Sequence, residues 1–298
     1  MQDIPGLVVL VLEIIALIVV GVALDPKTSS FVTYDATLSQ QYNPDSSIPY
    51  WLAILVPLIS LFISFGFFEY CRRVWSQELS SLRDQFGIWV VFFLDFVEAG
   101  VVNGIITDVT KNLVGRYRPD WLSRCQPAIV NPVEIQGFGM AAADNPACTR
   151  TDLPSSKIDD GHKSFPSGHS STAFCLGLFV CGHCIWQLFS RWKDYSYHCT
   201  QMHKRALYSL TRSLVFLWIL LQVGWAWGVA VSRVVDNKHH VGDIVAGAVL
   251  GGIVGTMFVF KSVQRVSHDI QPVERQTGRC GSDEDDLSSL RPGEPSSC

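Results

Sequence analysis

The stretch KSFPSGHSSTAFCLGLFVCGHCIWQLF, residues 163–189, decides the fold class, because a polar turn opens an apolar segment long enough to cross a bilayer. Residues 170–189 carry no Asp, Glu, Lys or Arg, whereas the preceding PSGH turn carries a titratable ring and a glycine. Backbone N–H groups and the positive end of the dipole at a helix start favour an anion. The stretch therefore predicts an anion site at a membrane surface.

Similar apolar segments elsewhere predict an all-α integral membrane bundle. The chain is 48% hydrophobic and only 17% charged, which fits a membrane protein. We expect one membrane domain over residues 1–262 and a disordered, acidic cytosolic tail over residues 263–298. The domain is predicted to contain six transmembrane helices of roughly 20 residues each, at residues 7–24, 51–68, 87–110, 170–189, 213–231 and 241–260.

Lysine and arginine are unevenly distributed between the two sides of the predicted membrane. Loops 69–86 and 190–212, together with the tail, hold 13 of the 23 basic residues, and basic residues collect on the cytosolic side. We therefore expect both termini in the cytosol and loop 111–169 on the lumenal or extracellular side of the plasma membrane or an endomembrane. The scattered basic residues and the net charge of −4 give no nucleic-acid footprint.

Three short stretches carry candidate chemistry, and alternating spans deliver all three to the same predicted face of the membrane. Singly each is weak, because lysine and arginine often extend to the interface from span ends. Their convergence at one surface instead predicts a functional site. The stretches are KNLVGRYRP with Lys111 and Arg118, PSGH with Ser167, Gly168 and His169, and SRVVDNKHHVGD with Arg233, His239 and Asp243.

These cationic and backbone groups are suited to binding a phosphate dianion. Lys111, Arg118 and Arg233 would neutralise its charge, and the two arginines offer forked donors that match its oxygens. Ser167 and Gly168 precede a helix, so free N–H groups would point at the same anion. Glycine also lets the backbone approach the anion closely.

The two histidines suit a displacement at phosphorus. His239 and Asp243 are four residues apart, so on one helix face the carboxylate would accept one ring N–H and leave the other nitrogen free to attack. His169 would donate a proton to the departing oxygen and later act as base. A zinc site at His239, His240 and Asp243 is disfavoured, because adjacent helical side chains diverge by about 100° and nearby cations oppose a divalent ion. We expect no metal and no cofactor.

The three stretches resemble the complete signature of the type-2 phosphatidic acid phosphatase, or lipid phosphate phosphatase, family. GRYRPDWLSRC resembles the eukaryotic diacylglycerol-pyrophosphate and phosphatidate phosphatase branch, and the resemblance covers roughly residues 7–260. It implies a six-helix membrane fold, with the active site at the extracytosolic membrane surface, and a metal-independent phosphatase that forms a phosphohistidine. The phosphate ligands that it implies are Lys111, Arg118, Ser167, Gly168, His169 and Arg233.

The expected substrates are lipid phosphates in the bilayer, such as phosphatidate, lysophosphatidate, sphingoid phosphates or diacylglycerol pyrophosphate. The residues of the signature are expected to contact the phosphate group, so they do not identify the rest of the substrate. A polyprenyl-pyrophosphate or sugar-phosphate enzyme, and a lipid phosphotransferase, therefore remain open. A catalytically silent relative that binds lipid or scaffolds partners is the alternative from another class. Homo-oligomerisation is also left open.

Ionisable residues inside spans are functional candidates by default. Asp108 lies about one turn before Lys111 and could orient its ammonium group. Asp95 and Glu98 lie away from the predicted chemistry, so we expect them to form structural pairs, and we expect the same of Glu13.

Four residues of the long outer loop have two interpretations each. Cys125 and Cys148 could form a disulfide in an oxidising compartment, and the sequence leaves this open. Arg116 and Arg124 could steer an anionic head group or lie on a solvated loop.

Cysteines inside an apolar segment are expected to pack as small hydrophobic residues, namely Cys175, Cys181 and Cys184.

Overall fold

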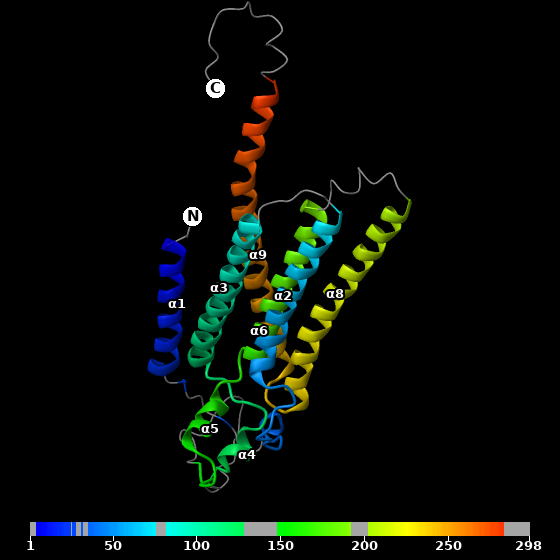
Figure 1. Cartoon of the computed structure of the whole chain (residues 1–298). Helices are drawn as coiled ribbons and strands as arrows, with labels where there is room; N and C mark the ends of the chain where they lie inside the picture. The colour runs from blue at the N-terminus through cyan, green and yellow to red at the C-terminus, as the bar shows by residue number, and fades with distance from the viewer. Residues whose placement is uncertain are drawn as a thin grey trace, which may run out of the picture.

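The computed structural model describes residues 4–24, 26–27, 31, 35–75, 82–127, 148–191 and 202–282, and this part of the chain is helical and without strands. Long helices form a bundle, with the short helices α4 and α5 at one end (Figure 1). The all-α prediction is confirmed. The long helices are α1 Ile4–Ala23, α2 Tyr50–Trp75, α3 Leu82–Val114, α6 Gly168–Trp186, α8 Met202–Val235 and α9 Val241–Ser282. The short elements are η1 Ala36–Leu38, α4 Trp121–Cys125, α5 Ser155–Asp159, η2 Asp160–His162 and the π-helical turn η3 Gln187–Arg191.

Five helices are long and apolar enough to cross a bilayer, by length and composition. They coincide with five of the six predicted segments. The first predicted segment, residues 7–24, forms the 20-residue helix α1, whose apolar stretch Gly6–Gly21 is shorter than those of the five candidate spans. The five candidate spans are Tyr50–Arg73, Gln85–Val114, Gly168–Ser190, Tyr208–Val235 and Val241–Ser267.

Helix α9 continues beyond the predicted end of the last span. It remains helical through Ser282, whereas disorder was expected from residue 263. Low hydrophobicity indicates that a segment buries little surface, but it does not prevent a helix that has already formed from extending, because adding a residue to a helix is easier than starting one. Residues 283–298, where the acidic cluster falls, lie outside the described residues.

Helix α6 lies at the centre of the bundle and positions the PSGH turn. Within its span, 72% of the residues are buried in the protein, against 28–39% in the other four spans. Helix α9 packs directly on the α6 backbone because Gly251 and Gly255 have no side chains. A Cβ at Gly251 would lie 2.0 Å from the carbonyl oxygen of Ser171, and one at Gly255 would lie 2.1 Å from that of Cys175. This small-residue contact holds the first half of α6 against α9.

Polar groups inside the bundle join α3 to α9. Asp95 accepts a hydrogen bond of 2.7 Å from the Ser262 hydroxyl. Glu98 accepts two hydrogen bonds, of 2.7 and 2.6 Å, from the Lys261 ammonium group. The structural pairing predicted for these two carboxylates is confirmed. Glu13 differs, because its Oε2 is buried without a hydrogen-bond partner among the described residues.

The loops beyond the bundle form a small folded cap. Cys125 and Cys148 form a disulfide, so the question that the sequence left open is answered. The rings of Phe31, Tyr117 and Trp121 pack together beside Cys125. The three cysteines expected to pack inside the bundle are buried free thiols, namely Cys175, Cys181 and Cys184.

The three signature stretches meet at the end of the bundle that carries this cap. Helices α3 and α8 end there and α6 and α9 begin there, whereas α1 begins and α9 ends at the opposite end (Figure 1). The predicted convergence on one face is therefore present in the fold.

Candidate active site

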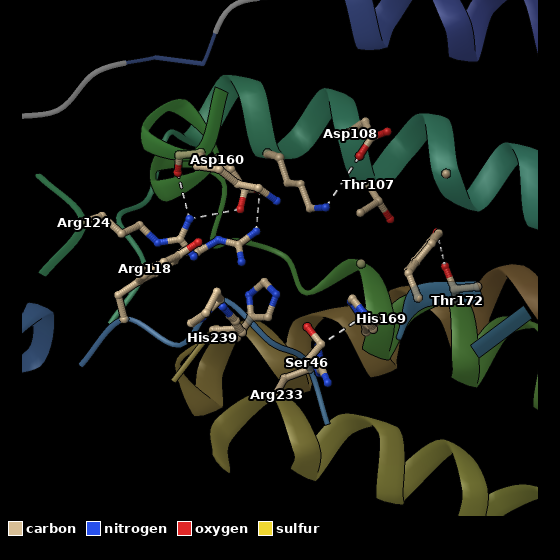
Figure 2. A pocket seen from close by; sticks show the side chains of 18 residues that line it. Ser46, Thr107, Asp108, Arg118, Arg124, Asp160, His169, Thr172, Arg233 and His239 are labelled. Carbon is tan, nitrogen blue, oxygen red and sulfur yellow. Dashed lines mark hydrogen bonds and ion pairs between the residues drawn. The ribbon is translucent and has the colours of Figure 1, made fainter. Parts of the chain in front are cut away.

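A cavity of about 380 Å³ lies where these helix ends meet. Figure 2 shows its side chains, which come from α2, α3, α6, α8 and the loops between them. Of the eight predicted site residues, Ser167 and Asp243 lie behind the cavity wall. The six that line it are Lys111, Arg118, Gly168, His169, Arg233 and His239.

Lys111 extends from the last turn of α3 across the start of α6. A Cβ built on Gly168 would lie 2.9 Å from the Lys111 Nζ, so glycine is the residue that leaves room for the ammonium group. Asp108 Oδ1 lies 3.6 Å from the same Nζ, which is the orienting contact expected for this carboxylate. The two side chains are three residues apart and therefore share one face of α3.

Ser167 caps α6 instead of lining the cavity. Its hydroxyl accepts a hydrogen bond from the Ser170 N–H, and its own N–H donates to the Asp243 carbonyl oxygen at 2.9 Å. The Ser167 N–H predicted to bind an anion is therefore already used. Within the described chain, the N–H groups of Gly168 and His169 are left without partners, and unpaired groups at a helix start attract anions.

Arg118 is held by a carboxylate that the sequence did not indicate. Its Nη2 donates to Asp160 Oδ1 at 2.8 Å, and Arg124 Nη1 donates to the other oxygen at 3.3 Å. Burial raises the pKa of the Asp160 carboxyl, but Arg118, Arg124 and Lys111 together bring it below its usual range, so Asp160 is ionised. The Nε of Arg118 is buried and has no hydrogen-bond partner in the described part of the chain. A donor left in this way suits an incoming anion.

Arg233 is 1% exposed and is fixed from several sides. Its Nη2 donates to Asp236 at 2.8 Å and to the Ile48 carbonyl oxygen at 3.0 Å. Its Nη1 lies 3.3 Å from Ser46 Oγ and 3.3 Å from His169 Nε2. An arginine can only donate, so His169 Nε2 accepts and the ring proton lies on Nδ1.

His239 lies opposite His169 and is held by a backbone carbonyl. Its Nδ1 lies 2.7 Å from the Ser164 carbonyl oxygen, which can only accept. Nδ1 therefore carries the proton, and Nε2 is the free nitrogen. Burial, and after it the charges of Arg118 and Lys111, lowers the pKa of His239 well below its ordinary value, so the ring is neutral at pH 7.

The direct hydrogen bond predicted between His239 and Asp243 is replaced by an indirect connection through Ser164. Asp243 accepts from the Ser164 hydroxyl at 2.6 Å, from the His240 N–H at 3.0 Å and from Arg116 at 2.7 Å. The physical reason is that α9 begins only at Val241, so His239 lies in the preceding turn and not on the helix face of Asp243.

The two outer-loop arginines are both paired with carboxylates, but Arg116 is 43% exposed whereas Arg124 is buried. Arg116 binds Asp243, and Arg124 is 1% exposed and makes two hydrogen bonds, of 2.8 and 2.9 Å, to Asp120. Their positions follow from the path of loop 115–127, which carries no periodic sequence signal. Among the described residues, no group of three histidine, cysteine, aspartate or glutamate side chains is arranged to hold a metal ion.

A bundle of apolar helices that holds a cavity lined by cations and two histidines defines a membrane protein with a cavity suited to an anion. The chain belongs to the PAP2 superfamily, whose family model matches residues 92–266, more than half of the chain.

Curated relatives that the chain resembles come from plants, yeast and animals. It is 29% identical to lipid phosphate phosphatase 2 of Arabidopsis thaliana over 76% of this chain and 66% of the relative. It is 26% identical to diacylglycerol pyrophosphate phosphatase 1 of Saccharomyces cerevisiae over 78% of this chain and 70% of the relative. It is 25% identical to phospholipid phosphatase 2 of Rattus norvegicus over 78% and 76%. The matched relatives are thus phosphatases by name.

Proposed function

We propose that the protein is an integral membrane phosphatase that hydrolyses lipid phosphate monoesters or pyrophosphates without a metal ion. The observation that carries the proposal is the cavity in which Lys111, Arg118 and Arg233 surround the free Nε2 of His239. The names of the relatives support a phosphorylated lipid as substrate. Apolar helices beneath the cavity suit a head group whose acyl chains stay in the bilayer.

We further propose that α1 is a sixth span and that the cavity faces the lumen or exterior. Leu17 of α1 lies against Gly104 of α3, with its Cδ1 3.3 Å from the position of a Cβ on that glycine. Beyond α1, the Lys27 N–H donates to the Asn112 carbonyl oxygen near the outer end of α3. Helix α1 therefore runs alongside α3 at membrane depth, and six spans leave both termini in the cytosol.

The proposed reaction has two displacements at phosphorus. In the complex, the phosphate dianion stabilises a second proton on His169, which enters the reaction as an imidazolium. His239 Nε2 attacks the phosphorus atom, the bond from phosphorus to the lipid oxygen breaks, and this imidazolium gives one proton to that oxygen and becomes neutral. Water then attacks the phosphohistidine and loses a proton to His169, the Nε2–phosphorus bond breaks, and inorganic phosphate leaves. Arg233 and Lys111 offset the charge that develops on the phosphoryl oxygens.

Ser164 and Asp243 hold the nucleophile in the productive orientation. The Ser164 carbonyl fixes the proton of His239 on Nδ1, which points Nε2 away from the protein wall. The Ser164 hydroxyl is itself anchored on Asp243, which Arg116 and the His240 N–H hold in place. The carboxylate thus positions His239 through Ser164, and the role is that of an indirect orienting group.

The test is phosphate release from phosphatidate in mixed micelles with a chelator present. The protein should turn over, and His239→Ala should abolish turnover while the protein elutes and melts as a folded species. Asp243→Asn should slow turnover without abolishing it, because Asp243 does not touch the ring. If no inorganic phosphate is released from any of the lipid phosphates tested, the protein is instead a catalytically silent relative that binds lipid. A requirement for added divalent metal would refute the mechanism.

A further inference from the structure

The cavity holds two carboxylates, and they differ in their surroundings. Asp160 lies on the outer wall and is shared by Arg118 and Arg124 at 2.8 and 3.3 Å. Asp108 lies on α3, its side chain is 41% exposed, and its ion pair with Lys111 is long, at 3.6 Å. Within the described part of the chain, Lys111 is the one cation within ion-pairing distance of Asp108. Asp108 therefore retains capacity to accept a hydrogen bond from a ligand.

Asp108 lies on the bilayer side of the phosphate-binding cations. It precedes Lys111 by three residues, which is about 4.5 Å along the helix axis toward the centre of the span. Figure 2 shows Asp108 and Thr107 on α3. The cavity continues past them along Gly104 and along Tyr50, whose hydroxyl contacts the Thr172 hydroxyl at 2.9 Å.

In the proposed reaction, the phosphoryl group of a phosphate ester lies between Lys111 and His239, and its ester oxygen is directed toward His169. Because Asp108 lines the same cavity on the bilayer side of Lys111, the first carbons of the lipid are then expected to lie beside Asp108. A carboxylate at this place repels a dianion, unless the substrate itself brings a positive charge or a proton donor next to its phosphate.

We propose that Asp108 is a specificity-determining residue that accepts a hydrogen bond from a protonated amine on the carbon next to the phosphate-bearing carbon of the substrate. This inference rests on the proposed phosphatase function. Sphingoid-base phosphates carry such an amine, whereas phosphatidate carries an ester at the same carbon. A lipid pyrophosphate brings its second, inner phosphate toward Asp108 and is disfavoured. The charge of Asp108 therefore discriminates between substrates whose phosphate groups bind the cations equally well.

The test compares a sphingoid-base phosphate with its N-acetyl derivative, which has the same skeleton and a neutral nitrogen. In the unsubstituted protein, kcat/KM should favour the amine by about tenfold or more, the effect of one charge-assisted hydrogen bond. Asp108→Asn should bring the ratio of the two values close to one. The same substitution should raise the ratio for diacylglycerol pyrophosphate over phosphatidate. Simple misplacement of Lys111 would not shift these two ratios in opposite directions.

Asp160→Asn is the matched control, because it also removes a carboxylate from a cation of the cavity but on the outer wall. It should change kcat/KM by the same factor for all four lipids. The ratio of the amine to its N-acetyl derivative, and the ratio of diacylglycerol pyrophosphate to phosphatidate, should therefore stay the same. Equal kcat/KM values for the amine and its N-acetyl derivative in the unsubstituted protein would overturn the proposal whatever the variants do. So would an Asp108→Asn protein that keeps the full preference for the amine.

A binding measurement separates this inference from the proposed function. Dissociation constants of the same two lipids are measured on the full-length His239→Gln protein in detergent, with and without Asp108→Asn. Tighter binding of the amine that depends on Asp108 supports the inference even if no lipid phosphate is hydrolysed. Active hydrolysis with no difference between the two lipids in binding or turnover rejects the inference and leaves the phosphatase function intact.

Discussion

The substitution Gly168→Ala is expected to separate the stability of the bundle from the chemistry of the cavity. The new Cβ would lie 2.9 Å from Lys111 Nζ, so the ammonium group must move by about 0.6 Å or more to reach ordinary contact. Its other close neighbours, Lys111 Cε and Thr107 Cγ2, lie at an ordinary 3.7 Å. The end of a lysine side chain moves easily, so the α6 backbone can stay in place. Alanine also restricts the unfolded chain more than glycine does, which stabilises the folded protein by about 0.4–1 kcal/mol.

The cost should therefore appear in substrate binding and turnover. A displaced Lys111 loses a charge-assisted hydrogen bond to the phosphate, which is worth about 1.5–3 kcal/mol. This corresponds to a fall of about tenfold to hundredfold in kcat/KM for phosphatidate. The melting temperature in detergent should stay the same or rise. A value of kcat/KM within about twofold of that of the unsubstituted protein would show that Gly168 does not make room for Lys111.

The matched control is Gly224→Ala on α8, where a Cβ would have no neighbour within 4 Å. It makes the same change in the entropy of the unfolded chain without touching the cavity. Its kcat/KM should match that of the unsubstituted protein. An equal fall in both variants would indicate a general effect of alanine on the bundle.

Three other perturbations have expected outcomes. Because burial and the charge of Arg118 lower the pKa of His239, kcat/KM should keep its full value at pH 7 and fall only well below pH 6.5. In the Arg118→Gln protein the pKa of His239 should be higher, so kcat/KM should begin to fall at a higher pH. Gly251→Ala places a Cβ 2.0 Å from a backbone oxygen of α6, so the free energy of unfolding should fall by about 1–3 kcal/mol or more, as measured by thermal unfolding. Reducing the Cys125–Cys148 disulfide, which closes a separation of 23 residues, should lower the melting temperature by an amount equivalent to about 3 kcal/mol, whereas a Cys148→Ser protein should not respond to reductant.

The sequence predicts the membrane helices and the meeting point of the three stretches for a simple reason. Long apolar segments must be helical in a bilayer, and alternating spans determine which ends share a face. The contact of Asp108 with Lys111 is predictable as well, because both residues lie on one helix at fixed spacing. These features depend on local geometry alone.

The contacts made by loops could not be predicted in the same way. The Asp160 carboxylate reaches the cavity and the Ser164 carbonyl reaches His239 because segment 148–167 folds back over the end of α3 and the start of α9. No periodicity specifies that path. The spacing of His239 and Asp243 correctly predicts that the two residues lie near each other. The direct hydrogen bond predicted between them is wrong, because His239 lies in an irregular turn before α9 begins at Val241, and its ring points in another direction.

The charge of the cavity depends on contacts that the signature does not contain. Each of the three signature cations already has a carboxylate within 4 Å, so the cavity is not a bare positive cluster. Unpaired, these charges would repel one another in surroundings of low dielectric constant. With partners, they hold their geometry before substrate arrives, and a dianion must compete with carboxylates that remain at hand. In the proposed reaction, the same carboxylates favour release of inorganic phosphate once the bond to histidine breaks, because the cations regain a partner at once. The pairs are Lys111 with Asp108 at 3.6 Å, Arg118 with Asp160 at 2.8 Å and Arg233 with Asp236 at 2.8 Å.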